Sequence, residues 1–312
     1  MRLIKLVPAD TNFDFTGKRI AAFSLSVAMI ILSLLFFTVR GLNFGIDFQG
    51  GIMIDVKFEQ APDIPSLRTQ LDGLDLGEVE IQEFGEPENI LIRVQRQEGD
   101  EKAQLAAITA VKEALGNGPD YRRTEFVGPK VGSELIESAV WAICLSLLAI
   151  MIYIWFRFEW QFGVGAVVAL MHDVATTIGL FAILQLEFNL STIAAILTIA
   201  GYSINDTVVV YDRVRENLRK YRKMPLPDLL NKSINQTLAR TTMTSMTTLL
   251  ALLALYFFGG EVIHDFVFAM IWGVFVGTYS SIFVAAPLLI KLNLRRDFGE
   301  GPTAPASEET PA

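Results

Sequence analysis

Six long runs of apolar residues constrain this chain more than any other feature of its sequence. Each run is about 18 residues or longer, the length a helix needs to cross the hydrocarbon core of a bilayer. The six windows are residues 20–39, 139–156, 164–184, 190–211, 241–258 and 266–290. A soluble bundle would need helices with a polar face, and the runs AICLSLLAI and LLALLALYFF leave almost none. The sequence therefore predicts an α-helical, multi-pass membrane protein with six transmembrane helices.

Lysines and arginines are distributed unevenly among the connections between these windows. Sixteen of them lie before the first window, between the second and third, between the fourth and fifth, or after the sixth, whereas the connections 185–189 and 259–265 contain none. Because basic loops stay on the cytoplasmic side, residues 1–19 and the tail 292–312 are predicted to be cytoplasmic. Residues 40–138 then lie outside. The first window is too long for the apolar core of a signal peptide, and no cleavage site follows it, so it is predicted to be a retained anchor.

The segment outside the membrane is acidic and has its own alternating pattern. Residues 40–137 hold 10 basic and 19 acidic residues, a balance that disfavours nucleic acid and anionic lipid as partners. Predicted strands at 51–58, 78–84, 89–95 and 121–127 alternate with predicted helices at 64–73 and 100–116. The order βαββαβ predicts a ferredoxin-like α+β domain with both helices on one face of the sheet. The tail from residue 297 is acidic and rich in proline, and is predicted to be disordered.

Motifs for enzymatic chemistry do not occur in this sequence. It contains no G-x-S-x-G, Walker A or G-x-G-x-x-G pattern. The single Cys144 allows no disulfide within the chain, and two separated histidines make a poor metal site. We therefore expect no enzyme activity, no cofactor and no metal. Any energy that the protein uses should come from an ion gradient.

Two carboxylates fall inside the apolar windows, at Asp173 and Asp206. An aspartate near the centre of a membrane helix costs about 2.5 to 3.5 kcal/mol, so we expect each to face protein or water. Asp173 belongs to a four-residue repeat with Gly165, Ala169 and Thr177, and Ser203 precedes Asp206 by three residues. A third polar repeat, Arg240, Thr244 and Thr248, begins the fifth window. The simplest assembly turns the three stripes inward together.

A pairing of Asp206 with Arg240 follows from that assembly, and small changes in geometry would then control protonation of the carboxyl. Asn205 precedes Asp206 and belongs to the same candidate proton route. His172 precedes Asp173 and serves either as a proton relay or as a packed core histidine. Two alternatives stay open: the hydroxyl residues act as glue between helices, and Arg240 is only a topology anchor.

The sixth window carries Gly273, Gly277 and Ser281 at intervals of four residues. This surface lets another helix approach closely, either from this chain or from another one.

Three further stretches carry a resemblance to a known family. They are GIDFQGG at 45–51, VGPKVGSEL at 127–135 and GYSINDTVVVYDRVREN at 201–217. In this order, with one large domain after the first window, they resemble the SecF branch of the SecD/SecF family of bacterial protein-export subunits, within the resistance-nodulation-division superfamily. The resemblance implies that the chain is one six-helix half of a two-half machine. The glycines Gly45, Gly50 and Gly51, with Asp47, would form the tight junction between membrane and outer domain, since glycine tolerates backbone angles that other residues do not.

The resemblance also implies a function, partners and a location. A SecF-like subunit of the bacterial inner membrane would use the proton gradient, together with SecD, for late steps of protein export. Its expected partners are SecD, the SecYEG channel, YajC, protons and an unfolded polypeptide in transit, with no nucleic acid. In this family the positions of Asp206 and Arg240 are taken to lie on the proton route. Two other functions stay open: a half-transporter for lipids or small amphiphiles, and a scaffold that transports nothing.

Overall fold

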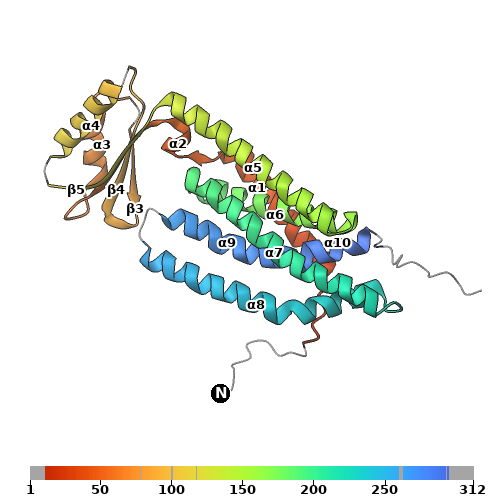
Figure 1. Cartoon of the computed structure of the whole chain (residues 1–312). Coiled ribbons are helices and arrows are strands. Elements are labelled where there is room, and N and C mark those ends of the chain that lie inside the picture. The colour runs from red at the N-terminus through yellow and green to blue at the C-terminus, as the bar shows by residue number, and fades with distance from the viewer. Residues whose placement is uncertain are drawn as a thin grey trace, which may run out of the picture.

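The computed structural model shows a bundle of long helices with a small α/β domain at one end (Figure 1). It describes residues 11–292 and Leu294, apart from 78, 100, 117 and 260–262. The first five long helices are α1 (Arg19–Arg40), α5 (Pro129–Arg157), α6 (Trp160–Leu184), α7 (Leu190–Lys220) and α8 (Leu226–Phe258). The sixth consists of α9 (His264–Ser280), a π-helical segment η2 (Ser281–Ala285) and α10 (Ala286–Lys291). All six are long and apolar enough to cross a membrane, which confirms the predicted spans.

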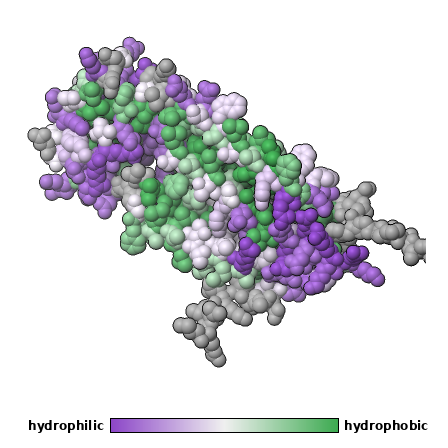
Figure 2. Space-filling view, in the orientation of Figure 1, coloured by the Kyte–Doolittle hydropathy of each residue, from purple (hydrophilic) through white to green (hydrophobic). Residues whose placement is uncertain are grey.

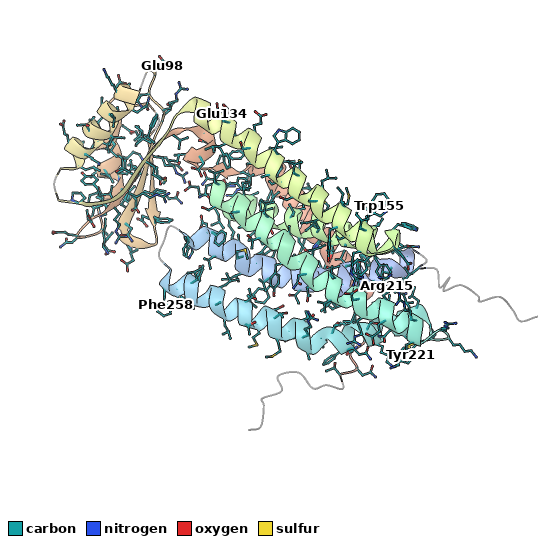
Figure 3. The ribbon with its side chains drawn as sticks, in the orientation of Figure 1. Glu98, Glu134, Trp155, Arg215, Tyr221 and Phe258 are labelled. Atoms are coloured by element: carbon teal, nitrogen blue, oxygen red, sulfur yellow. The ribbon has the colours of Figure 1, made fainter. Side chains whose placement is uncertain are left out.

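The helices extend beyond the apolar windows at their polar ends. α7 continues past residue 211 through a basic last turn, and α8 begins at Leu226, well before the window at 241. Hydrophobic residues cover the middle of the bundle, and hydrophilic residues gather at the end far from the α/β domain (Figure 2). Arg215 and Tyr221 lie at this far end, and Phe258 lies at the opposite end of α8 (Figure 3). We call these two ends the far end and the domain end.

Helices α6, α7 and α9 form the centre of the bundle, because small residues let them pack closely. A Cβ atom at Gly273 would overlap Ile199 of α7, and one at Gly277 would lie 3.1 Å from the Ser203 Cβ. The small-residue face of the sixth span therefore packs inside this chain, against α7. On the other side of α6, Gly179 makes room for Ser33 of α1. By contrast, α5 and α8 are largely exposed on the outside of the bundle.

The α/β domain has the predicted βαββαβ order. Its elements are β2 (Gly51–Lys57), α3 (Ile64–Asp72), β3 (Val79–Phe84), β4 (Glu86–Val94), α4 (Glu101–Leu115) and β5 (Asp120–Val127). The four strands form one antiparallel sheet in the order β3-β4-β2-β5, which is the ferredoxin-like arrangement. Helices α3 and α4 cover one face (Figure 1), and their contacts with alternate strand residues form the core of the domain. The other face is turned toward the domain end of the bundle.

Three short elements, which we did not predict, join the domain to the bundle. Strand β1 (Asn43–Phe44) and helix α2 (Ile46–Gln49) lie between α1 and the sheet, and strand β6 (Glu187–Phe188) lies between α6 and α7. Helix α5 begins at Pro129, before the predicted domain boundary at residue 138, which stays a prediction. Its first turns contact α2, so the second span starts within the base of the domain. Most of the predicted cytoplasmic tail and the first ten residues lie outside the described residues.

Candidate functional site

Asp173 lies where α6, α7 and α9 meet. Its side chain is 0% exposed. The Oδ2 atom accepts hydrogen bonds from the Ser203 hydroxyl at 2.5 Å and from the Ser280 hydroxyl at 2.7 Å, so residues of all three helices share this carboxyl. A buried carboxyl is tolerated in such a place when hydrogen bonds replace its water. The predicted stripe of Gly165, Ala169, Asp173 and Thr177 does face the interior.

His172 contacts Asp173 directly instead of sharing a third partner with it. The His172 Nδ1 atom is 2.9 Å from the other carboxyl oxygen, Oδ1. The imidazole is 2% exposed, and its Nε2 atom is buried without a hydrogen-bond partner among the described residues. The two side chains thus form one buried acid–imidazole pair whose second ring nitrogen is still available to a proton or a water molecule.

Asp206 lies on α7, one helical turn closer to the far end than Ser203. Asp206 is 6% exposed, and its Oδ2 atom is buried without a hydrogen-bond partner among the residues that the structure describes. The hydroxyls of Thr241 and Ser281 and the guanidinium of Arg240 are near this carboxyl, and the Thr241 hydroxyl is itself buried without a partner among the described residues. This carboxyl is therefore less completely paired than Asp173. Such an incompletely paired buried group calls for a functional explanation.

The structure does not bring Asp206 and Arg240 into an ion pair. No N···O distance of 4.0 Å or less joins these two described side chains, and Arg240 is exposed. The expectation that its stripe turns inward is wrong, because Arg240 and Thr244 face away from the bundle. Residues on another side of α8 face inward instead, and the Ser245 hydroxyl is 2.8 Å from the Thr278 hydroxyl of α9. The roles of Asp206 and Arg240 in a proton route remain predictions.

Asn205 also points away from the bundle, although it is adjacent to Asp206. We use the name α7/α8 polar face for exposed small and polar residues of this part of α7 and of the neighbouring helix α8. Its members are exposed residues of two neighbouring helices: Gly201, Asn205, Arg240, Thr244 and Thr247. Polar side chains at membrane depth are costly when they face lipid. Such a face is a candidate contact surface for a further helix.

The domain junction begins with a short ladder between two distant segments. Strand β1 pairs in parallel with β6, with Asn43 opposite Glu187 and Phe44 opposite Phe188. The Gly45 amide continues the ladder by donating to the Phe188 carbonyl at 2.9 Å. Since β6 leads directly into α7, this ladder ties the base of the domain to the start of the helix that carries Asp206.

The motif GIDFQGG supplies three kinds of contact to this junction. Gly50 and Gly51 have φ values of 75° and 121°, backbone angles that glycine adopts more readily than other residues. Gly45 has an ordinary φ of −72°. Glycine fits at this position for a steric reason, because a Cβ atom there would overlap the Glu187 carboxylate. The Asp47 Oδ2 atom accepts a hydrogen bond at 2.9 Å from the Leu190 amide, the first residue of α7. A carboxylate at a helix N-terminus is stabilising.

An ion pair completes the junction. Arg93 of β4 lies 2.5 Å from Glu187 of β6, with side chains 12% and 17% exposed, and Arg93 is also 3.4 Å from the Asn43 side chain. Burial raises the pKa of the Glu187 carboxyl, and the nearby Arg93 offsets this only in part. Desolvation of such a pair can exceed its Coulombic gain. Removing one partner would nevertheless leave a buried charge alone.

Sequence reasoning found Asp173, Asp206 and the glycines but missed Arg93 and Glu187. Arg93 is the one charged residue of the predicted strand 89–95, and Glu187 lies in the short connection 185–189, but neither segment indicates that the two residues meet. The one available signal was Glu187 itself, the only charged residue in the connection 185–189.

Comparisons with known families and proteins give consistent matches. Residues 107–295 match the family model described as "Protein export membrane protein SecD/SecF, C-terminal", and residues 35–62 match the "SecD/SecF GG Motif". A relative from Rhodobacter capsulatus, "Protein translocase subunit SecF", is 50% identical over 94% of this chain and 93% of its own length. A Rickettsia prowazekii protein of the same name is 48% identical, over 92% and 93% of the two chains.

Solved structures match in fold as well. A crystal structure of SecDF from Thermus thermophilus, described as a translocon-associated membrane protein, superposes with a TM-score of 0.84 at 39% identity. It matches 92% of this chain, which spans only 39% of the SecDF chain. SecDF in a super-membrane-facing form gives a TM-score of 0.69 at 37% identity, over 95% of this chain and 40% of that one.

Proposed function

Because the chain belongs to the SecD/SecF family of protein-export membrane proteins, we propose that it is a SecF-like translocase subunit driven by the proton gradient. It would work with SecD beside the SecYEG channel, with YajC as a further partner, in the late steps of export. The protein lies in the bacterial inner membrane in this proposal. The basic far end of the bundle, with both chain termini, is cytoplasmic, and the α/β domain is outside.

The observation that carries the proposal is the position of Asp206 on α7. Its carboxyl is buried with one oxygen unpaired, and the first amide of the same helix is bonded to Asp47 of the domain junction. A change of charge at Asp206 therefore acts on a helix that is tied to the outer domain at its other end. One proton crossing 100 mV supplies about 2.3 kcal/mol, enough to shift a two-state equilibrium by tens of fold.

The polar network around Asp173 supports a proton route through the same helices. Ser203 of α7 links Asp173 to the helix that carries Asp206, and the Nε2 atom of His172 offers a further protonation position. Arg240 forms no ion pair with Asp206 in this arrangement of the helices. In a second arrangement the guanidinium of Arg240 would approach the ionised Asp206 carboxylate, and protonation of Asp206 would remove the attraction between the two groups.

The α7/α8 polar face supports pairing with a second six-helix half. A partner helix from SecD would cover Asn205 and Arg240, and exposed Gly201 would let it approach closely, since a Cβ atom there meets no atom within 4 Å. The length comparison agrees with this arrangement, because this chain matches only 39% of the SecDF chain.

A half-transporter for lipids is the second candidate. It would need a large apolar chamber in the outer domain. The cavity of about 90 Å³ at the domain junction is instead lined by several carboxylates, and two neighbouring grooves of about 250 and 830 Å³ both include the charged Arg93 in their lining. A passive scaffold would tolerate a neutral residue at Asp206.

The test measures export and proton uptake in proteoliposomes that contain the chain with SecD and SecYEG. The substitution Asp206→Asn should leave folding and SecD association unchanged and abolish the stimulation of export by a proton gradient. Asp212→Asn is the matched control, because Asp212 lies on the same helix with an exposed side chain paired to Arg157. Gradient-driven export that persists at the normal rate with Asp206→Asn would refute the proton role.

A further inference from the structure

A cavity lies between the sheet and the domain end of the bundle. Residues on the sheet face opposite α3 and α4 form one wall, and residues at the starts of α7 and α9 form the other. It measures about 90 Å³, room for the end of one long side chain. Five carboxylates line it, against the single cation Arg123: Asp47, Asp55, Glu125, Glu187 and Asp265.

Most of these carboxylates already have a partner. Glu125 is bonded to Arg123 at 2.6 Å, Glu187 is paired with Arg93, and Asp47 accepts from the Leu190 amide. Asp265 lies 3.6 Å from His264. These contacts leave the cavity with an excess of negative charge. Arg122 and Arg123 attract the Asp55 carboxylate, and Arg123 lies opposite it in the sheet, but the Oδ1 atom of Asp55 has no hydrogen-bond partner among the described residues.

Asp55 is the unusual member of the set. Residues 51–56 of β2 are all buried, and Asp55 is the one charged residue among them. It is 6% exposed, and its Oδ1 atom is buried without a hydrogen-bond partner among the described residues. The strand register shifts between Asp55 and Val56, and such a bulge re-aims a side chain. A buried carboxylate oxygen without a hydrogen-bond partner costs stability, so the free Oδ1 atom of Asp55 points to a ligand that pairs with it.

The chemistry of the walls selects the class of ligand. Met53, Leu91 and Phe266 give the cavity an apolar side next to the carboxylates. No group of three acidic, histidine or cysteine residues in the described part of the chain has the arrangement of a metal site. An amphipathic cation fits instead: an aliphatic stem against the apolar side and an ammonium or guanidinium group at Asp55.

We propose that this cavity binds a lysine or arginine side chain of the polypeptide that is being exported, with Asp55 as its counterion. The identity of the polypeptide rests on the proposed function. The cavity itself lies at the junction that ties the outer domain to α7. An occupied cavity would therefore hold the domain against the bundle, and release would free it.

The test measures binding of a fluorescent Ala-Arg-Ala peptide to the full chain in detergent micelles, without any gradient. The same peptide with citrulline, the neutral isostere of arginine, is the reference. The chain should bind the arginine peptide about tenfold more tightly than the citrulline peptide, since one charge-assisted hydrogen bond in a buried site has about this effect. Asp55→Asn should abolish the preference.

Asp63→Asn is the control, because Asp63 caps α3 and does not line the cavity. Ser191→Trp fills the cavity from the bundle side and should also abolish binding, so the proposal stays testable if Asp55→Asn fails to fold. Equal binding of the two peptides, or unchanged preference in both variants, would overturn the proposal. Uptake of Na⁺ or Ca²⁺ without a peptide preference would overturn it as well. Because no gradient is used, a failure here is distinct from a failure of the proton role of Asp206.

Discussion

The ion pair between Arg93 and Glu187 leads to a prediction about how the outer domain is held. Replacing Arg93 with Met removes the counterion of the Glu187 carboxylate, whose side chain is 17% exposed in the structure. Replacing Glu187 with Gln leaves the guanidinium with only its longer contacts to Asn43 and Glu80, both 3.4 Å. Removing one partner of a buried pair costs about 3 to 5 kcal/mol. We use the lower value, because both side chains keep some contact with water.

A loss of about 3 kcal/mol raises the equilibrium constant for local opening by about a hundredfold. The assay is hydrogen exchange of the Gly45 amide, which donates to the Phe188 carbonyl in the β1–β6 ladder. Either single substitution should accelerate this exchange by about that factor. Amides in the core of the sheet, such as that of Ile54, should be unaffected.

The double substitution Arg93→Met with Glu187→Gln provides the decisive comparison. It removes both charges together, so most of the protection at Gly45 should return. If the free-energy loss in the double variant equals the sum of the losses in the two single variants, or if neither single variant changes the exchange rate, the ion pair does not hold the junction as we argue.

Three further predictions concern the carboxyls and glycines of the structure. Burial raises the pKa of the Asp55 carboxyl above its ordinary value of 3.8, against the lowering effect of nearby arginines. The folded domain therefore holds this one proton more tightly than the unfolded chain, so the contribution of Asp55 to stability is fully present below pH 3.8 and is lost as the pH rises through the folded pKa. Asp55→Asn should remove this pH dependence and raise the thermal midpoint of the domain at pH 7; a lower midpoint would contradict the burial argument. Gly273→Leu should lower the free energy of unfolding by about 1 to 3 kcal/mol, because the larger side chain forces α9 away from α7. Gly201→Leu should leave the isolated chain folded and prevent its association with SecD, as judged by size-exclusion chromatography of each variant. Co-elution of Gly201→Leu with SecD would refute the assigned face. Asp47→Ala should cost about 1 kcal/mol at the start of α7 and accelerate exchange of the Leu190 amide about fivefold, while Asp63→Ala, which removes the same kind of cap from α3, should not affect Leu190.

The sequence alone determined the architecture to a large extent. Membrane-spanning windows, the βαββαβ order and the glycines at 50 and 51 depend on local properties: hydropathy over a helix length, strand alternation and backbone angles. Asp173 and Asp206 were also found from sequence, because a charge inside an apolar window is unusual wherever its partners lie. For Asp173 the structure confirms the inward position that this argument required.

Only the tertiary structure decided which residues meet. His172 contacts Asp173, Arg240 faces away from the bundle, and Asp47 bonds to an amide 143 positions later in the chain. A helix repeat states which residues share a stripe, but the direction in which the stripe points depends on the rotation of each helix against its neighbours. That rotation is set by close contacts such as Gly273 against Ile199. The junction and its unpaired Asp55 have the same origin, since they exist only where the sheet and the helix ends, far apart in sequence, are brought together.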